Sequence, residues 1–203
     1  MVLSLLLTRK FRVISIDNYH NSNPKSLHRV SQIARDALPV NASEEEKLSA
    51  EVHSYQVDLT DAPEVRKVFE HCGKGNILGL IHIAALKAVG ESAEIPLKYY
   101  RVNVAATLTL LELMDEFESY RFVYSSSATV YGIAPKIPIP ETTPLNGESV
   151  YGRTKVISET MLQDICRCTY THSFRSHIFH YRLGFFSSIA DPKWRIISLR
   201  YFK

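Results

Sequence analysis

The sequence predicts an α/β domain with a Rossmann-like, doubly wound parallel sheet. Short apolar segments alternate with longer amphipathic segments along the 203 residues, and this order favours parallel strands joined by crossover helices. Two of the apolar segments run into an acid, Asp17 and Asp58, at the position where ligands bind in such sheets. A chain of this length can bury one sizeable core.

Short, β-branched or glycine-bounded apolar runs predict the strands. The run that contains "NILGLIHIAA" is apolar on both faces, which is typical of a buried parallel strand. The predicted strands cover residues 11–16, 53–59, 76–85, 121–127 and 194–202.

Apolar residues at helical spacing predict the helices. "LSLLL" indicates the end of a buried helix with the cations that follow in its last turn. The helix after the second strand begins with Thr60 or Asp61 as N-cap and Pro63 in its first turn. The predicted helices cover residues 3–7, 23–38, 60–72, 95–117 and 149–167, and residues 42–52 form a surface helix or loop.

Charge and composition exclude several classes of protein. The chain carries 24 basic and 21 acidic residues, a net charge of +3, which does not indicate a nucleic-acid or membrane-surface partner. No stretch reaches the roughly 18 apolar residues that a membrane span needs. Three cysteines, Cys72, Cys166 and Cys168, make no disulfide framework, so we expect a reducing, cytoplasmic location.

The acids at the strand ends allow two interpretations each. Asp17 is placed to bind the adenosine ribose of NAD, or it is a turn residue ahead of the turn-rich "NYHNSNP". Asp58 similarly faces an adenine, or it shares the capping of the next helix with Thr60 and Asp61.

All eight glycines lie at Gly73 or beyond. A glycine-rich phosphate loop between a first strand and a first helix is therefore missing, and we expect the chain to begin inside that helix. Without the central first strand, the strands that end near Asp17 and Asp58 have no neighbour that joins them to the strand ending near Ala84. Unpaired backbone groups cost about 1–3 kcal/mol each, so we expect an unstable or rearranged sheet.

The stretch "SVYGRTK" places Tyr151 and Lys155 four residues apart. Alone, this spacing describes an ordinary solvated helix face as well as a phenol and an ammonium arranged to move protons. Two further segments decide between these interpretations, "HIAALKAVGES" over residues 82–92 and "VYSSSATVYG" over residues 123–132. Together with "VYGRTK" (150–155), they resemble the UDP-glucose 4-epimerase family of the extended short-chain dehydrogenase/reductase superfamily.

The resemblance runs over residues 2–167 and resumes over residues 191–202. It implies that Tyr151 is the general acid/base at the 4-hydroxyl of UDP-glucose or UDP-galactose, and that Lys155 stabilises the phenolate and holds the nicotinamide ribose. Ser127 would bind the same oxygen, and Thr129 would assist. The family further implies NAD as cofactor and a possible homodimer. Its cofactor contacts map to Asp17, Asn18, Asp58, Leu59, Ala84, Ala85, Lys87, Asn103, Tyr151 and Lys155.

Related 4,6-dehydratases need an acid pair directly after the equivalent of Ser127. Here that place holds Ala128 and Thr129, so the dehydratase reaction is not expected. Val150 stands where the family often has proline, which leaves the chemistry untouched.

Residues 169–190 depart from the family. They contain no Lys, Asp or Glu and are rich in aromatic residues, and their removal restores the family's spacing. We interpret residues 1–168 as a partial NAD-binding Rossmann domain, 169–190 as an insert of translated intron or gene-model error, and 191–203 as a further strand before a sugar-nucleotide domain that is missing. The second hypothesis for the chain is therefore a non-catalytic fragment that holds no cofactor.

The same segment raises a weak zinc hypothesis, since cysteine and histidine are zinc ligands. The cluster consists of Cys166, Cys168, His172, His177 and His180. Its spacing fits no standard site, and we assign no metal.

Overall fold

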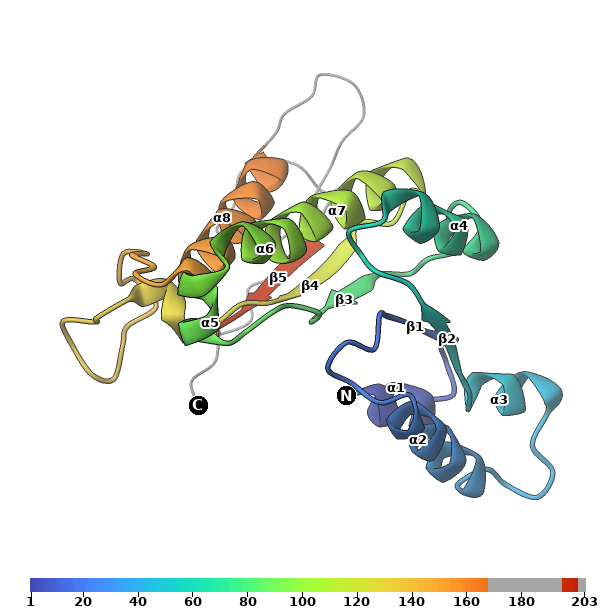
Figure 1. The fold of residues 1–203 in the computed structure, drawn as a ribbon. Helices are drawn as coiled ribbons and strands as arrows, with labels where there is room; N and C mark the ends of the chain where they lie inside the picture. The colour runs from blue at the N-terminus through green and yellow to red at the C-terminus, as the bar shows by residue number, and fades with distance from the viewer. Residues whose placement is uncertain (168–194, 201–203) are drawn as a thin grey trace. The chain divides into compact units, whose positions relative to one another are not determined.

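The computed structural model describes residues 1–167 and 195–200 (Figure 1). The segment interpreted as an insert, residues 169–190, lies outside them. The chain divides into two compact units, Met1–Val68 and Phe69–Lys203, and each unit is described by itself.

A two-stranded parallel sheet organises the first unit. Its strands β1 and β2 pair in register from Val13 opposite Val52 to Asp17 opposite Gln56, so both strands end at the same edge. A small core of Leu6, Ala34 and Ala50 holds the helices against the sheet. The elements are α1 (Val2–Leu7), β1 (Val13–Asp17), α2 (Lys25–Asp36), α3 (Glu44–Ser49), β2 (Val52–Gln56) and α4 (Ala62–Cys72), which crosses the boundary between the units.

The predicted strands and helices of this unit are confirmed, with two refinements and one correction. Residues 44–49 are helical because Ser43 and Glu46 form a reciprocal capping box. Asp61, not Thr60, caps α4, since its carboxylate accepts the Glu64 N–H at 3.2 Å. The cations expected in the last turn of α1 instead follow the helix, because Thr8 caps it and Arg9 turns to φ 53°.

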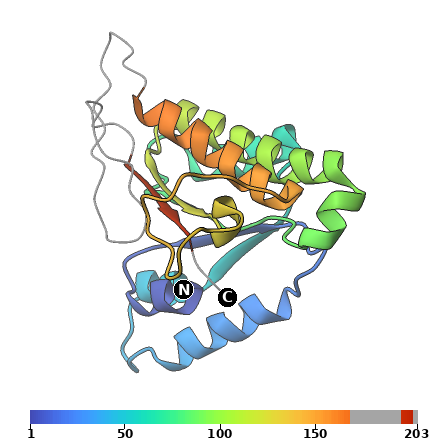
Figure 2. The ribbon, with the colours of Figure 1, turned by 90° about the vertical axis from the view of Figure 1, so that its left-hand side faces the viewer.

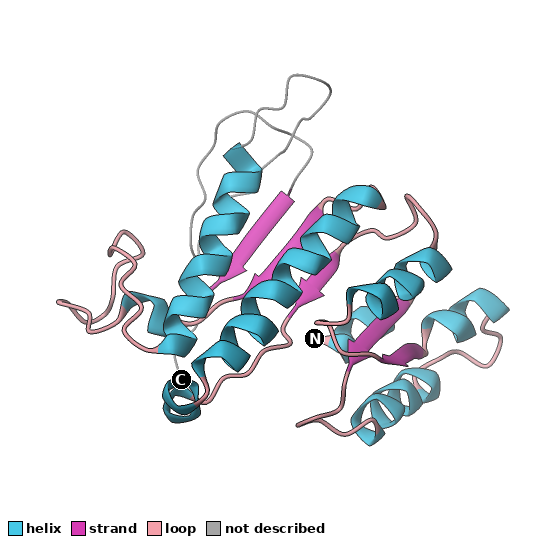
Figure 3. Cartoon of the chain, turned by 45° about the horizontal axis from the view of Figure 1, so that its top comes forward, coloured by secondary structure: helices cyan, strands magenta, loops and turns pink. Residues whose placement is uncertain are grey.

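The second unit contains a three-stranded parallel sheet in the order β3-β4-β5. Phe122 and Tyr124 of β4 point to the buried side, both 1% exposed, and α7 and α8 lie across one face of the sheet (Figures 1, 2 and 3). The strands are β3 (Leu80–His82), β4 (Arg121–Ser125) and β5 (Arg195–Leu199). The helices are α5 (Val89–Glu94), α6 (Pro96–Tyr100), the π-helix η1 (Arg101–Ala105), α7 (Ala106–Glu116), the 3-10 helix η2 (Ala128–Tyr131) and α8 (Val150–Arg167).

The single long helix predicted for residues 95–117 is interrupted in the structure. One π-helical turn, η1, separates α6 from α7, and π turns of this kind are frequent at functional sites. Two short elements were not predicted at all, α5 and η2, because neither shows a full helical period of apolar residues.

The break expected between the early and late strands is present. Among the strands that the structure describes, β1 and β2 form one sheet and β3, β4 and β5 another, with no ladder between the two sets. No helix within the same part of the chain has the length and apolar character to cross a bilayer.

Gly132 holds the turn that follows η2. Its φ is 62°, and a Cβ there would lie 2.3 Å from the Asn146 carbonyl oxygen. We expect Gly132→Ala to lower the free energy of unfolding by about 2 kcal/mol or more, since it combines left-handed strain with a backbone clash. Urea denaturation followed by circular dichroism measures this loss.

Gly90 supplies the matched control, because a Cβ on this α5 residue would meet nothing within 4 Å. Gly90→Ala should leave stability unchanged or raise it slightly through helix propensity. Equal losses in the two variants would contradict the assignment of strain to Gly132.

Candidate active site

The first two turns of α8 carry the predicted acid–base pair in buried positions. Tyr151 is 8% exposed and Lys155 3% exposed. Residues four apart on a helix share a face, and the Lys155 Nζ lies 5.8 Å from the centre of the Tyr151 ring. The structure therefore contradicts the interpretation of this pair as a solvated helix surface.

Lys155 is held at the end of β4. Its Nζ donates to the backbone oxygen of Ser125 at 2.8 Å and lies 4.8 Å from the centre of the Tyr124 ring. Burial lowers the pKa of Lys155 to about 8, while Glu159 acts in the opposite direction. The amine therefore keeps its proton at neutral pH, close to the point at which it would lose it.

Ser127 and Thr129 form a small hydroxyl pair just beyond β4. The Ser127 Oγ accepts a bond from the Thr129 N–H at 3.3 Å and another from the Thr129 Oγ1 at 3.1 Å. Both bonds use Ser127 as acceptor, so its own proton remains as a donor for a third group. Thr129 thus orients Ser127, which is a more specific role than the general assistance expected from sequence.

Glycine brings α8 close to this hydroxyl pair. A Cβ on Gly152 would lie 2.8 Å from the Thr129 carbonyl oxygen, so the helix that carries Tyr151 packs directly on η2. Because Tyr151 and Gly152 are consecutive, the contact fixes the start of α8 beside the segment that carries Ser127.

Asn103 ties the loop after β3 to α8. Its Oδ1 accepts the Leu86 N–H at 2.9 Å, and its Nδ2 donates to the Leu86 oxygen at 2.9 Å and to the Thr154 Oγ1 at 3.1 Å. The side chain is 1% exposed and its amide is fully used by protein groups. The structure thus gives this predicted cofactor contact a positioning role.

Tyr99 and Ser92 hold the next part of this loop, although neither was predicted from sequence to have a role in the site. The Tyr99 hydroxyl lies 2.8 Å from the Ala88 oxygen and 2.6 Å from Glu91 Oε2, so the two acceptors share its single proton. Ser92 accepts the Tyr151 N–H at 3.2 Å. Their local sequence gives no signal for these contacts, which join segments far apart in the chain.

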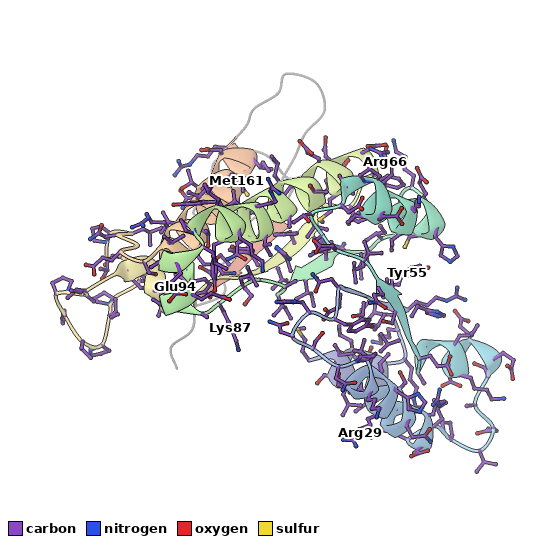
Figure 4. All side chains as sticks on the ribbon, in the orientation of Figure 1. Arg29, Tyr55, Arg66, Lys87, Glu94 and Met161 are labelled. Atoms are coloured by element: carbon purple, nitrogen blue, oxygen red, sulfur yellow. The ribbon has the colours of Figure 1, made fainter. Side chains whose placement is uncertain are left out.

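The remaining predicted contacts in the loop lie toward solvent. Ala84 is exposed and Ala85 half-buried. Lys87 is exposed, and its side chain points outward from the loop (Figure 4). This outward direction leaves the ammonium available to an anionic ligand.

The predicted acids of the first unit lie at the ends of its strands, because Asp17 is the last residue of β1 and Asp58 follows β2 by two residues. Asp17 accepts the Tyr19 N–H through Oδ1 at 2.7 Å, so the turn interpretation holds for one of its oxygens. Asp58 accepts the Thr60 N–H at 2.9 Å, the Thr60 hydroxyl at 2.7 Å and the Asn18 amide at 2.9 Å. The bonds from Thr60 and Asn18 lower the pKa of Asp58.

Asp58 does not share the capping of α4, because its carboxylate bonds Thr60 and Asn18 ahead of the helix and Asp61 is the N-cap. Leu59, the next residue, is half-buried. The amide of Asn18 is thus engaged with Asp58, while one oxygen of Asp17 carries no bond among the described contacts of this unit.

The family model described as GDP-mannose 4,6 dehydratase matches residues 1–182. The chain belongs to this family. UDP-glucose 4-epimerase of Dictyostelium discoideum is 37% identical over 197 residues, 97% of this chain and 46% of that protein, and the Schizosaccharomyces pombe enzyme is 41% identical over 164 residues, 79% of this chain and 41% of that protein.

Solved structures of the family share the fold. The crystal structure of UDP-glucose 4-epimerase from Bifidobacterium longum in complex with NAD⁺ and UDP superposes with a TM-score of 0.75 and 35% identity, over 99% of this chain and 48% of that chain. This Rossmann relative confirms the predicted fold class. The chain spans about half the length of the curated relatives it matches.

Each unit, taken by itself, has side chains that suit one part of a dinucleotide. In the second unit, a buried cation and a phenol at a strand end suit a nicotinamide ribose and a reacting hydroxyl. In the first unit, the free oxygen of Asp17 suits a ribose diol. No glycine turn precedes Gly73 to present backbone N–H groups to a pyrophosphate.

The zinc hypothesis gains no support from the part of the chain that the structure describes. Within it, no group of three or more His, Cys, Asp or Glu side chains is placed to hold a metal. Cys166 is buried at the end of α8, and the other four members of the cluster lie outside the described ranges.

Removing the Asn103 amide should loosen the loop after β3. Asn103→Ala leaves the Leu86 N–H and C=O without partners in a part-buried place, so we expect a loss of about 3 kcal/mol in the free energy of unfolding. Asn76→Ala is the control, since its exposed Nδ2 makes one bond, to the Cys72 oxygen at 2.9 Å, and its removal should cost less than about 1 kcal/mol. Equal costs would contradict the anchoring role.

His82 should make stability fall in mild acid. Burial and the nearby Lys155 lower the pKa of His82 to about 3, from 6.5. Below pH 6.5 the unfolded chain therefore takes up a proton that the folded chain refuses, so stability is lost as the pH falls. We expect the loss between pH 7 and pH 5 to be about 1–2 kcal/mol larger in the wild type than in His82→Gln.

Urea titrations at each pH measure this difference. His71→Gln, which changes an exposed histidine at the end of α4, should follow the wild-type curve. A His82→Gln curve parallel to the wild type would show that His82 is protonated in the folded state.

Proposed function

We propose that the protein is a UDP-glucose 4-epimerase, which interconverts UDP-glucose and UDP-galactose with NAD. The observation that carries this proposal is the buried pair Tyr151 and Lys155 beside the donor Ser127, at the carboxyl end of β4. The similarity to epimerases from several kingdoms points to the same reaction.

Tyr151 is assigned the proton transfer at the sugar 4-hydroxyl. A free phenol has a pKa near 10, too high for a base at neutral pH. Lys155 is buried within 5.8 Å of the Tyr151 ring, and its positive charge favours the phenolate there more strongly than it would in water. Tyr151 then takes the proton from O4 and returns it after the configuration at C4 has changed.

Ser127 is assigned to bind and orient the same oxygen. Thr129 supplies both bonds that Ser127 accepts, which leaves the Ser127 proton to donate to O4. In this arrangement one hydroxyl orients the sugar and another removes its proton, which is the usual division between positioning and general base catalysis.

The chemistry that NAD would supply when bound is the reversible transfer of a hydride at C4 of the sugar. The residues proposed to hold it in the second unit are Ala84, Ala85, Lys87, Tyr151 and Lys155, with Asn103 fixing the loop. Those proposed in the first unit are Asp17, Asn18, Asp58 and Leu59, of which Asp17 presents a free carboxylate oxygen to a ribose hydroxyl.

A dehydratase reaction is not proposed, although the matching family model carries that name. Elimination of water across C5 and C6 needs an additional acid and base. Beside Ser127 stand Ala128, which cannot transfer a proton, and Thr129, whose hydroxyl is bonded to Ser127.

The second candidate is a non-catalytic chain of the same family. The observation that favours it is the separation of the described strands into two sheets with no ladder between them. In this candidate the acid–base residues persist without a stably bound cofactor.

A homodimer and a cytoplasmic location belong to the same proposal by family resemblance. Light scattering of the purified chain tests the first, and fractionation of cells that express a tagged chain tests the second. The interpretation of residues 169–190 as an insert also stays a proposal, and transcript reads across both junctions test it.

Turnover of UDP-galactose by the 203-residue chain separates the two candidates. With added NAD, proton NMR of the anomeric signals should show conversion to UDP-glucose, and Tyr151→Phe should reduce the rate by about 10²–10⁴-fold because the proton acceptor is lost. Tyr100→Phe, which changes a half-buried tyrosine on α6, should retain the wild-type rate.

Two results would reject the epimerase proposal. One is the absence of conversion by a folded wild-type chain at saturating NAD, which favours the non-catalytic candidate. The other is an undiminished rate in Tyr151→Phe, which would place the proton transfer elsewhere.

A further inference from the structure

Glu159, one turn beyond Lys155 on α8, forms a buried ion pair with Arg200, which follows β5. Glu159 is 0% exposed, and both of its carboxylate oxygens accept from Arg200, with the Arg200 Nε at 2.9 and 3.1 Å. A further bond joins the Arg200 Nη2 to Glu159. No step assigned to Tyr151, Lys155 or Ser127 uses either residue.

Side chains from two other elements, η2 and β5, hold this pair in place. The Arg200 Nη1 donates to the Tyr131 hydroxyl of η2 at 2.8 Å, and the Ser198 Oγ of β5 donates to Glu159 Oε1 at 3.2 Å. A buried pair of this kind contributes little net stability, because desolvation of both charges offsets their attraction. Its geometry therefore calls for an explanation other than stability.

The position of Glu159 relative to Lys155 supplies that explanation. The two residues are four apart on α8 and both are buried, at 0% and 3% exposure, so the carboxylate and the ammonium lie on one face of the helix away from water. A carboxylate one helical turn away favours the charged form of an amine, and the effect is larger where both groups are buried.

The other groups around Lys155 are less able to stabilise its ammonium form. Tyr124 and Tyr151 present their rings to it, and His82 stays neutral because burial lowers its pKa to about 3. Other elements packed against α8 also carry titratable or charged groups. They include Tyr131 of η2, Arg200, and Glu91 of α5. Glu91 is exposed and bonded to Tyr99 of α6. Among the groups named, Glu159 is the buried anion.

We propose that the Glu159–Arg200 pair is a positioning device for the acid–base centre, in which Arg200 fixes a buried carboxylate one turn from Lys155 so that the Lys155 amine stays an ammonium at neutral pH. Arg200 supplies the matching charge and two donor groups for the buried Glu159 carboxylate, since an unpaired buried charge is costly. The proposal rests on the role of Lys155 in the proposed function, and it assigns the maintenance of that role to two residues outside the reacting groups.

The charge of Glu159 can be removed while the shape is kept. In Glu159→Gln the anion is lost and the Arg200 cation is left unmatched, and both changes disfavour the ammonium form of Lys155. We expect the titration midpoint of Lys155 to fall by about one pH unit or more. In Glu159→Asp the pair is distorted but the charge remains, so the midpoint should stay near the wild-type value even where thermal stability falls.

The titration is read directly, without NAD or sugar. The full chain is labelled with ¹³Cε-lysine, the Lys155 signal is identified by its loss in Lys155→Arg, and its chemical shift is followed with pH. A failure of epimerase activity therefore leaves this measurement intact, and the two proposals fail separately.

A double variant covers the case in which Glu159→Gln does not fold. Glu159→Met combined with Arg200→Met leaves no unpaired buried charge, and such apolar replacements of buried ion pairs are often neutral or stabilising. The Lys155 midpoint should fall here too, by less than in Glu159→Gln, because the unmatched cation is gone.

An unchanged Lys155 midpoint in a folded Glu159→Gln, or in the folded double variant, would overturn the proposal. A midpoint that falls equally in Glu159→Asp and Glu159→Gln would also overturn it, because the shift would then follow disruption of packing and not loss of charge.

Discussion

The burial of one ammonium group constrains the second unit of this protein. Lys155 is 3% exposed, and a buried cation is stable only where dipoles or anions replace its lost hydration. The carbonyl oxygen of Ser125, the last residue of β4, does this by accepting a hydrogen bond from Lys155. The position of Lys155 thus depends on α8 running alongside β4, and that placement depends on the close contact that Gly152 permits with η2.

The same arrangement explains why the loop after β3 is so firmly held. Asn103 binds Leu86 on one side and Thr154 on the other, and Thr154 is the residue directly before Lys155. The π turn that contains Asn103 lies between two α-helices and bonds to α7 through Thr107, whose hydroxyl donates to the Asn103 oxygen at 2.7 Å. Loop and acid–base helix are therefore fixed by one residue, so displacement of either disturbs the other.

Sequence reasoning found the parts that leave a local pattern and missed those made by distant partners. Short, β-branched and glycine-bounded apolar runs predicted every described strand. The Tyr-x-x-x-Lys spacing and its two supporting segments predicted a site at Tyr151, Lys155 and Ser127, and the structure buries the first two of these side chains. Glu159 was missed because its partner Arg200 lies 41 residues away, and the pairing depends on β5 packing beside α8. Asn103 was predicted as a cofactor contact because of the family resemblance. In the structure its side chain instead bonds Leu86 and Thr154, and the sequence gives no sign of these contacts.

The residues proposed for the two parts of a dinucleotide lie in different units of this chain. Every contact described above for Lys155, Ser127 and the Glu159–Arg200 pair is made within the second unit, whereas Asp17 and Asp58 lie in the first. In the proposed arrangement, the groups that stabilise the Lys155 ammonium all belong to the second unit, so this stabilisation does not require a bound dinucleotide. Proton-transfer geometry can therefore persist where cofactor binding is weak, so loss of activity alone does not locate a defect in the acid–base centre.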